Sequence, residues 1–555
     1  MKDPQRFTFL VGGEAGHGVR TAGTVASDLF GELGRYIFQM DDYQSLIRGG
    51  HNFSVVSSSV NPIFSQYLRA DLVVALDARS CDLHREHLSA QGILVYNSDA
   101  VNEDIPGAVG LPMSSLAKGY SYADLRLGVG AVAVLAAATG IARSTVEDFI
   151  GRKYLRDAAN NVTYALAVYD EASKSLGVRR QLEKGDAPAR SATGNEAIGL
   201  GAYAGGLDMY FAYPMTPASS VLHYLASHAE DFGITVVHPE SEIAVMNMAI
   251  GAASVGARTA VGSSGGGGAL MEEAMSLAGM SETPILCILS SRPGPSTGVP
   301  TYTAQGDLSF ALNQGHGEFS RIVASPGTVE EAYRVSAELM SLAWAFQTPA
   351  LLLTEKHLSE SRMTVASLAD FVPGPPSRMD ESTEGFGRYA DTSDGVSPMR
   401  FAPSGATIKW TSYEHDEKGI TTEDPDAISL MQEKRHRKRD TVVAHLRTCR
   451  CVNRFGDKGP LIITYGSTTM SVREALAAGG IDARVVQPVF LEPFPDWEFD
   501  ELAGEEAIVV EQSCDAQLAT LLTRRTGLNV IASILQYDGR PFDPEDLARR
   551  LKEVA

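Results

Sequence analysis

The chain has few cysteines, and their arrangement argues against the common cysteine-bound groups. Its 555 residues contain five: Cys81, Cys287, Cys449, Cys451 and Cys514. No Cys-x-x-Cys pair occurs, and the closest pair encloses a single arginine. The sequence therefore indicates neither a zinc site nor an iron–sulfur cluster bound by this chain. We expect reduced thiols.

Positive charge is also scarce. Lys and Arg number 47 against 68 Asp and Glu, which gives a net charge of −21 and a pI near 5.0. Phosphate contacts need clustered basic residues, so no nucleic-acid partner is expected. The one basic run, residues 433–440 (EKRHRKRD), suggests a solvated helix face or a salt-bridged seam against another subunit. Residues 414–419 (EHDEKG) have metal-ligand types, but adjacent side chains point apart, and we predict no metal site.

Long apolar runs are missing as well. The longest, residues 127–142, has 16 residues and is bounded by arginines. A membrane span needs about 20 apolar residues, so a buried helix and no membrane contact are predicted. The N-terminus enters an apparent strand without a secretory apolar region, and a cytoplasmic location is expected.

The sequence does not match the usual nucleotide-binding motifs. Residues 12–23 (GGEAGHGVRTAG) follow an apparent strand and open a helix, so their backbone N–H groups could bind an anion. The dinucleotide pattern is broken because Val19–Thr21 follow Gly16 and Gly18, and the Walker lysine is absent. A tight structural turn remains an alternative, and an NAD(P)-dependent dehydrogenase becomes a weak hypothesis.

Strand-like and helical stretches alternate along the chain, which predicts an α/β protein with parallel sheets. Changes in composition suggest three α/β domains joined by less regular segments. The expected boundaries are 1–175 for the first domain, 176–194 for a linker, 195–360 for the second domain, 361–455 for a connecting segment and 456–555 for the third domain.

Two polar loops follow strands of the second predicted domain. In Tyr213–Pro217 (YPMTP) two prolines fix the loop and present Thr216 rigidly. Arg292, in SSRPGPST, also follows a strand and stands before prolines, which suits bidentate recognition of a carboxylate. In open α/β sheets ligands bind beyond the carboxyl ends of the strands, so these loops are candidates for one site.

Glu242 and a run of glycines form a second pair of candidates. Glu242 is the first residue of an apparent apolar helix. In one interpretation Ser241 or Glu240 caps this helix, and the charge of Glu242 only stabilises its positive end. In the other, Glu242 is a buried carboxylate that holds or exchanges a proton on a ligand. Gly265–Gly268 are interpreted as a strand-to-helix turn that admits a ligand, or as a flexible turn that permits tight packing.

Taken together, these motifs carry a resemblance. YPMTP, ESEIAVMNMAIGA, SSGGGGALM, RPGPSTGVPT and QGDL, in this order, resemble the α subunit of the 2-oxoacid:ferredoxin oxidoreductases. GGEAGHGVRTAG and RGGH resemble that family's γ subunit, here fused ahead of α, and EHDEKGITTEDPD with EKRHRKR resembles the connecting segment. The tail, from VVEQS to YDGRPF, resembles a transketolase C-terminal-like domain.

The resemblance implies a fold and a cofactor. The three domains would be a Rossmann-like γ domain, a thiamine diphosphate pyrimidine-binding-type domain and a transketolase C-terminal-like domain. Glu242 would be catalytic and pair with the pyrimidine N1′ of thiamine diphosphate. Tyr213 and Pro214 would approach the ring, and Gly265 and Gly266 would lie beside it.

The substrate and coenzyme A residues are implied in the same way. Thr216, Arg292 and Thr297 would contact the 2-oxoacid, with Arg292 on its carboxylate. Coenzyme A contacts are assigned to the γ-like block, at Gly16, Gly18, Arg48 and Gly49. One departure concerns the substrate pocket, because Tyr302 stands where relatives often carry a charge.

Partners follow from what the chain lacks. It contains no Gly-Asp-Gly motif with a following Asn for Mg²⁺, so a β subunit is expected to supply the diphosphate and Mg²⁺ site and a four-iron four-sulfur cluster. An (αβ)₂ heterotetramer would decarboxylate a 2-oxoacid to acyl-CoA and CO₂, with electrons to ferredoxin, or fix CO₂ in reverse. The sub-type resembled is the 2-oxoglutarate enzyme. Pyruvate, branched-chain 2-oxoacids and a non-catalytic scaffold or regulatory role remain alternatives.

Overall fold

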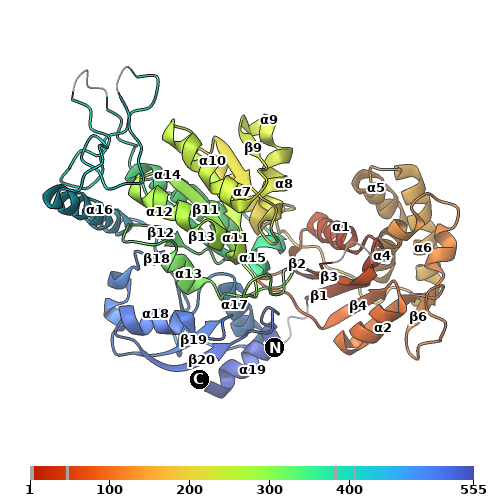
Figure 1. Cartoon of the computed structure of the whole chain (residues 1–555). Coiled ribbons are helices and arrows are strands. Elements are labelled where there is room, and N and C mark those ends of the chain that lie inside the picture. The colour runs from red at the N-terminus through yellow and green to blue at the C-terminus, as the bar shows by residue number, and fades with distance from the viewer. Residues whose placement is uncertain (1–4, 46–48, 369, 381–384, 405–406, 555) are drawn as a thin grey trace.

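The structure is a computed structural model that describes residues 5–45, 49–368, 370–380, 385–404 and 407–554. Its strands form three sheets of eight, seven and five strands. In Figure 1 the N-terminal block, coloured red to brown, stands at one side of the other two, and the C-terminal block, in blue, lies below the central one. Helices and strands alternate along most of the described chain, apart from the run β2, β3 and β4, and the predicted α/β class is confirmed.

The first sheet is mixed, with the order β6-β5-β4-β1-β3-β2-β14-β7. Its strands are β1 (Phe7–Ala15), β2 (Tyr36–Asp42), β3 (Gly49–Ser59), β4 (Ala70–Ala75), β5 (Leu88–Asn97), β6 (Val109–Leu111), β7 (Ser191–Thr193) and β14 (Arg362–Thr364). A parallel sheet was expected here, and this is wrong for β3, which is antiparallel to both β1 and β2. The reason is that β2 and β3 follow each other without a crossover helix.

The helices of this block are α1 (Val19–Glu32), α2 (Ala78–His84), α3 (Met113–Ala117), α4 (Ala123–Ala138), α5 (Arg143–Lys153) and α6 (Ala158–Leu176), with a 3₁₀ turn at Arg85–His87. Helix α4 is buried along its length from Arg126 onward, as its small apolar residues predicted. No helix in the described part of the chain is long and apolar enough to cross a membrane.

The central sheet has the order β18-β12-β13-β11-β10-β8-β9. Its strands are β8 (Met209–Ala212), β9 (Thr235–Val237), β10 (Thr259–Ser263), β11 (Ile285–Ser291), β12 (Ile322–Ala324), β13 (Pro349–Glu355) and β18 (Phe490–Glu492). Its helices are α7 (Gly194–Ala204), α8 (Ser219–Ser227), α9 (Ala229–Phe232), α10 (Glu242–Ser254), α11 (Gly265–Leu270), α12 (Glu272–Met280), α13 (Leu308–Asn313), α14 (Val329–Phe346) and α15 (Lys356–Glu360). Strands β8–β13 are parallel, so their carboxyl ends share one edge.

The C-terminal sheet has the order β15-β17-β16-β19-β20. It contains β15 (Val452–Phe455), β16 (Leu461–Ile463), β17 (Arg484–Pro488), β19 (Glu506–Glu511) and β20 (Asn529–Leu535), with α17 (Thr468–Gly479), α18 (Gln517–Arg525) and α19 (Pro544–Val554) and 3₁₀ turns at Asp496–Glu498 and Asp500–Leu502. Short strands cross the boundaries expected from the sequence: β7 and β14 join the first sheet, and β18 joins the central one. The boundaries themselves stay predictions.

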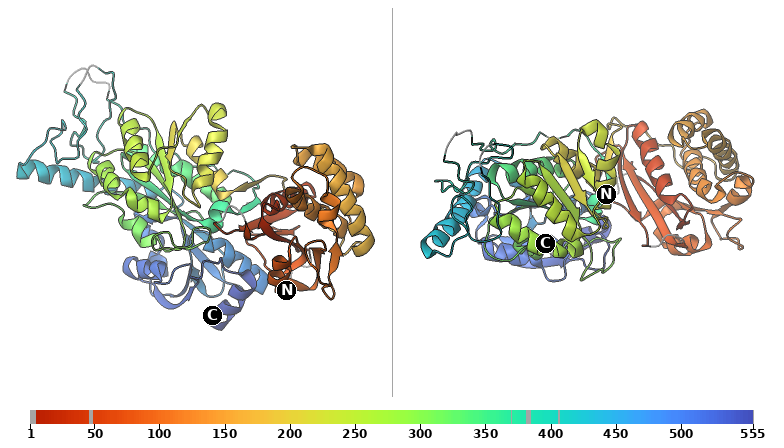
Figure 2. Two further views of the ribbon diagram at one scale, coloured as in Figure 1. Left: turned by 45° about the vertical axis from the view of Figure 1, so that its right-hand side comes forward. Right: turned by 45° about the horizontal axis from the view of Figure 1, so that its top comes forward.

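The basic run lies in α16 (Pro425–Leu446), which extends from the side of the central block in Figure 2. Lys434 and Lys438 are buried, and their Nζ atoms lie 2.6 and 2.5 Å from the two oxygens of buried Glu282. Arg435 pairs with Glu414 at 2.5 Å. The expectation of a solvated face is therefore wrong for Lys434, Arg435 and Lys438, which are buried and pair with acids of the same chain, whereas Glu433, His436 and Asp440 are exposed. The intersubunit seam stays a prediction.

A buried carboxylate joins the central and C-terminal sheets. Glu355, at the end of β13, accepts hydrogen bonds from the Ser467 backbone N–H at 2.5 Å and from Gln305 Nε2 at 3.3 Å. Gln305 Nε2 also donates to the Tyr465 carbonyl at 2.9 Å. Burial raises the pKa of Glu355 to about 7, and these hydrogen bonds oppose the rise only in part.

Replacing Glu355 with Gln is expected to weaken the pH dependence of stability between about pH 4.5 and 7. The folded protein keeps a proton that the unfolded chain releases above its ordinary pKa of 4.5, so stability falls as pH rises through this window. Relative to wild type, the thermal unfolding midpoint of Glu355→Gln should therefore rise between pH 5 and pH 8. Glu506→Gln, at an exposed position, is the control. If the thermal midpoints of wild type and Glu355→Gln change equally with pH, the expectation is contradicted.

Candidate active site

Two predicted residues meet at the carboxyl edge of the central sheet. Arg292 follows β11 directly, and Thr216 lies in the loop after β8. Arg292 Nη1 donates to the Thr216 carbonyl at 2.7 Å, while Arg292 Nε is buried and has no partner among the described residues. The guanidinium is thus fixed on one side and keeps donors for another acceptor.

Glu242 is the first residue of α10 and is only 4% exposed. Ser241 is the N-cap, and its hydroxyl accepts from the Ala244 N–H at 3.3 Å, so the helix start is satisfied without Glu242. Glu242 Oε1 is buried and has no hydrogen-bond partner in the described part of the chain. The Ser241 cap agrees with the helix-end interpretation of Glu242. The buried, unpaired carboxylate oxygen is the observation that the buried-carboxylate interpretation explains, since a ligand donor would pair it.

The four glycines are not a turn, as the sequence suggested, but the first residues of α11. A Cβ atom at Gly267 would lie 1.9 Å from Ser263 Oγ and 2.9 Å from Glu242 Oε1. One at Gly265 would lie 2.6 Å from Asp307 Oδ2, whereas one at Gly266 would come no nearer than 3.6 Å to the Ser296 carbonyl. Gly267, which sequence reasoning did not single out, is the glycine that lets α11 approach Glu242.

Asp307 was also missed, although it belongs to the QGDL motif. Its Oδ2 accepts from Ser291 Oγ at 2.6 Å. Burial raises the pKa of Asp307, with Ser291 and Arg292 opposing, and burial lowers the pKa of Arg292, with Asp307 opposing. The carboxylate therefore lies within the field of the Arg292 guanidinium. The QGDL motif could have drawn attention to Asp307, but the hydrogen bond between Asp307 and Ser291, the last residue of β11, could not be read from the sequence.

The other predicted residues of this edge are more exposed. Tyr213 is 38% exposed and makes an edge-on contact with His238, with ring centroids 5.9 Å apart. Pro214 beside it is exposed too. Thr297 lies on the exposed loop after Arg292 and hydrogen-bonds to none of the described site residues. The edge is thus open to solvent on the side of these residues.

The residues predicted for coenzyme A belong to two loops that the first sheet brings together. Ala15, at the end of β1, pairs with Gly49, at the start of β3. A Cβ atom at Gly16 or Gly49 would meet nothing within 4 Å, whereas one at Gly18 would lie 2.6 Å from the Leu125 carbonyl. Gly18 therefore permits helix packing, while Gly16 and Gly49 leave backbone accessible. Arg48 lies outside the described residues.

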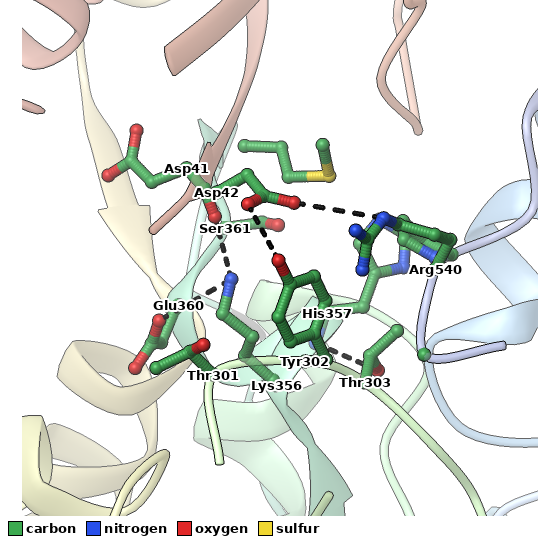
Figure 3. Close-up of a pocket in the computed structure, with 13 residues that line it drawn as sticks. Asp41, Asp42, Thr301, Tyr302, Thr303, Lys356, His357, Glu360, Ser361 and Arg540 are labelled. Carbon is green, nitrogen blue, oxygen red and sulfur yellow. Dashed lines mark hydrogen bonds and ion pairs between the residues drawn. The ribbon is translucent and has the colours of Figure 1, made fainter. Parts of the chain in front are cut away.

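A small polar cavity lies where the three blocks meet (Figure 3). Tyr302 donates to Asp42 Oδ1 at 3.3 Å, and the Arg540 guanidinium lies 3.9 Å from the centre of the Tyr302 ring. Lys356 Nζ donates to the Asp41 carbonyl at 2.6 Å. With about 20 Å³ the cavity has room for about one water. Tyr302 thus joins the blocks through Asp42 and Arg540.

Comparison with known proteins decides the family. Residues 200–434 match the family model "Pyruvate flavodoxin/ferredoxin oxidoreductase, thiamine diP-bdg", and residues 8–171 match "Pyruvate ferredoxin/flavodoxin oxidoreductase". The chain is 30% identical to the 2-oxoacid:ferredoxin oxidoreductase subunit alpha of a Sulfolobus species, over 99% of this chain and 97% of the relative. This chain belongs to the 2-oxoacid:ferredoxin oxidoreductase α subunits.

Further relatives of this α subunit carry 2-oxoglutarate in their names. It is 32% identical to the 2-oxoglutarate synthase subunit KorA of Archaeoglobus fulgidus, over 55% of this chain and 81% of the relative. It is also similar to the 2-oxoglutarate:ferredoxin oxidoreductase of Magnetococcus marinus, solved with 2-oxoglutarate, coenzyme A and succinyl-CoA bound. That match has 28% identity and a TM-score of 0.89 and covers 99% of this chain and 100% of the other.

Family membership fixes the general activity. The α subunit is part of an oxidoreductase that acts on 2-oxoacids with thiamine diphosphate and ferredoxin, and as an α subunit it belongs to a multi-subunit complex. The predicted family and enzyme class are confirmed. Among the described residues, no group of three or more His, Cys, Asp or Glu side chains is placed to hold a metal ion.

Proposed function

We propose that this chain is the catalytic, γ–α fused subunit of an enzyme that oxidatively decarboxylates 2-oxoglutarate to succinyl-CoA and CO₂ and passes the electrons to ferredoxin, reversibly. The observation that carries the proposal is the unpaired Glu242 Oε1, buried beside Gly267 at the sheet edge that also holds Arg292. Such a site offers one group that handles a proton and one that binds a carboxylate.

The residues of this edge fit the aminopyrimidine end of thiamine diphosphate. Glu242 would accept a hydrogen bond from the ring nitrogen N1′ and hold or move a proton there. Gly265 and Gly266 would lie beside the ring, with open space only at Gly266, and the backbone at Tyr213 and Pro214 would face it. When bound, the cofactor supplies the nucleophilic carbon and the electron sink for decarboxylation.

Substrate recognition is assigned to the Arg292 side of the edge. Arg292 is anchored to the Thr216 carbonyl and would take the carboxylate of the 2-oxoacid with its remaining donors. The Thr216 and Thr297 hydroxyls are further contact candidates. 2-Oxoglutarate is favoured because relatives over much of the chain carry that substrate in their names. Pyruvate and branched-chain 2-oxoacids are the alternatives.

The remaining parts of the reaction are assigned to other sites. A β subunit in an (αβ)₂ heterotetramer would hold the diphosphate, Mg²⁺ and a four-iron four-sulfur cluster, and ferredoxin would dock there. Coenzyme A would use the γ-like block, with Gly16, Gly18, Arg48 and Gly49 as candidates. We propose a cytoplasmic location for the complex.

Replacing Arg292 with Gln is expected to raise the KM for the 2-oxoacid by about 10- to 100-fold, because a charge-assisted hydrogen-bond pair to the carboxylate is lost. The measurement is steady-state kinetics of the reconstituted complex. Arg258→Gln is the matched control, since Arg258 also donates to a backbone carbonyl, that of Gly205 at 3.0 Å, but precedes β10 at the opposite end of the sheet. Equal KM values for the two variants would contradict the assignment.

The substrate is tested with the co-purified complex. Coenzyme A-dependent reduction of ferredoxin or viologen is compared for 2-oxoglutarate, pyruvate and 2-oxoisovalerate. The proposal predicts the largest kcat/KM for 2-oxoglutarate. Activity with either other acid alone would overturn the substrate, and unchanged turnover in Arg292→Gln and Glu242→Gln complexes would favour a scaffold subunit.

A further inference from the structure

One carboxylate at the carboxyl edge of the central sheet does not perform the task that its position suggests. Asp307 is the N-cap residue of α13, where an aspartate usually accepts a hydrogen bond from the first turn, but its side chain makes no such bond. Gln517 of α18 takes this role instead. Its Oε1 accepts from the Ser309 N–H at 2.8 Å, and its Nε2 donates to the Gly306 carbonyl at 2.7 Å. The helix start is therefore satisfied without the Asp307 carboxylate.

The Asp307 carboxylate lies instead against the two segments that the proposed function uses. Its Oδ2 accepts from Ser291 Oγ at 2.6 Å, and Ser291 is the last residue of β11, directly before Arg292. The start of α11 also approaches it closely, because a Cβ atom at Gly265 would lie 2.6 Å from Oδ2 and 2.9 Å from Oδ1. The carboxylate is thus in contact with the strand that leads to Arg292 and with a glycine proposed to lie beside the cofactor ring.

The charge of Asp307 is only partly compensated. Burial raises the pKa of Asp307, and the Ser291 hydrogen bond and the charge of Arg292 oppose this rise. Among the described residues, Ser291 is the hydrogen-bond donor to this carboxylate, and it reaches Oδ2 and leaves Oδ1 without a donor. A half-buried carboxylate with one unpaired oxygen is costly to the fold, and its field reaches the guanidinium that would bind the substrate.

The charges at this edge do not favour a ligand with several negative groups. Of the charged side chains assigned to the site, Arg292 is the cation, whereas Glu242 and Asp307 are acids. Arg292 Nη1 donates to the Thr216 carbonyl at 2.7 Å, so the guanidinium is held in place without help from Asp307. The effect of Asp307 on a bound substrate is therefore an effect of charge, and it grows with each negative charge that the ligand carries.

We propose that Asp307 is a specificity-determining residue that limits this edge to one substrate carboxylate. Its negative charge offsets part of the charge of Arg292, so the edge accepts the carboxylate beside the 2-oxo group and disfavours a second one. The distal carboxylate of 2-oxoglutarate then has to be bound by groups outside this edge. The inference rests on the proposed function, because it takes Arg292 as the group that holds the 2-oxoacid.

The test compares 2-oxoglutarate with 2-oxopentanoate, which has a methyl group in place of the distal carboxylate, as substrates of the co-purified complex. Asp307→Asn keeps the size of the side chain and an oxygen that can accept from Ser291, but it removes the charge. The ratio of kcat/KM for 2-oxoglutarate to that for 2-oxopentanoate is expected to rise about five- to tenfold. Ser291→Ala is the matched control: it removes the hydrogen bond and keeps the charge, so the ratio should stay within about twofold of wild type.

Inhibition provides a second measurement that does not depend on which 2-oxoacid the complex converts. Glutarate and pentanoate differ in the same way as the two substrates, and Asp307→Asn should lower the inhibition constant of glutarate relative to that of pentanoate. Asp307→Ser, which is neutral and smaller, should change both ratios in the same direction. The proposal is overturned if both neutral variants keep the wild-type ratios, or if Ser291→Ala raises them equally. A wild-type KM in Arg292→Gln would instead count against the proposed function.

Discussion

Replacing Glu242 with Gln is expected to lower kcat of the reconstituted complex by about 10²- to 10⁴-fold, the range typical for loss of a positioned acid–base group. The amide keeps the size of the side chain, so α10 and its Ser241 cap should stay intact. The buried Oε1 would still accept a hydrogen bond, but the side chain would no longer hold or release a proton. Steady-state kinetics with each 2-oxoacid provide the measurement.

Glu240→Gln is the matched control for this variant. Glu240 lies two residues earlier and is exposed, so its replacement should leave turnover near wild type. An effect of similar size in both variants would point to a general disturbance of the helix start. A Glu242→Gln complex with wild-type kcat would contradict the catalytic assignment.

The second prediction with a large expected effect concerns the stability of the fold and the residue Glu282. This residue is 1% exposed, and it is the acid between Lys434 and Lys438. Arg388 adds to the network by donating to the Glu282 carbonyl at 2.8 Å. Desolvation lowers the pKa of Lys434 to about 8 even with Glu282 beside it, which shows how costly these buried charges are.

Glu282→Gln is therefore expected to destabilise the fold by about 3–5 kcal/mol, because two ammonium groups stay buried without a countercharge. The shift in the urea unfolding midpoint of the purified chain measures the effect. Glu273→Ala, an exposed acid on α12, should change the midpoint little. Adding Lys434→Met and Lys438→Met to Glu282→Gln should recover part of the loss. No shift in Glu282→Gln would contradict the network's role.

The sequence was most informative where function is concentrated in loops after strands. Thr216 and Arg292 could be placed at one edge because parallel strands direct their carboxyl ends the same way, and the structure brings them into contact. Glu242 could be found at a helix start, but its burial and the missing partner of its Oε1 could not be read from the sequence.

What the sequence could not supply are contacts between distant segments. Gly267 matters through its approach to Ser263 and Glu242, and Asp307 through its bond to Ser291. The local pattern of α16 indicates solvent or partner contacts for its basic residues, because the acid that pairs with Lys434 and Lys438, Glu282, lies about 150 positions away in the chain.

The most direct test of the account is the rate at which the thiazolium C2 proton of thiamine diphosphate exchanges with deuterium in the assembled complex, followed by quench and NMR. This rate needs no 2-oxoacid, coenzyme A or ferredoxin, so it reports on the proton-handling role of Glu242 alone. We predict that Glu242→Gln slows the exchange by at least about 10²-fold, while Glu240→Gln does not change it. Equal exchange rates in wild type and Glu242→Gln would contradict the central claim.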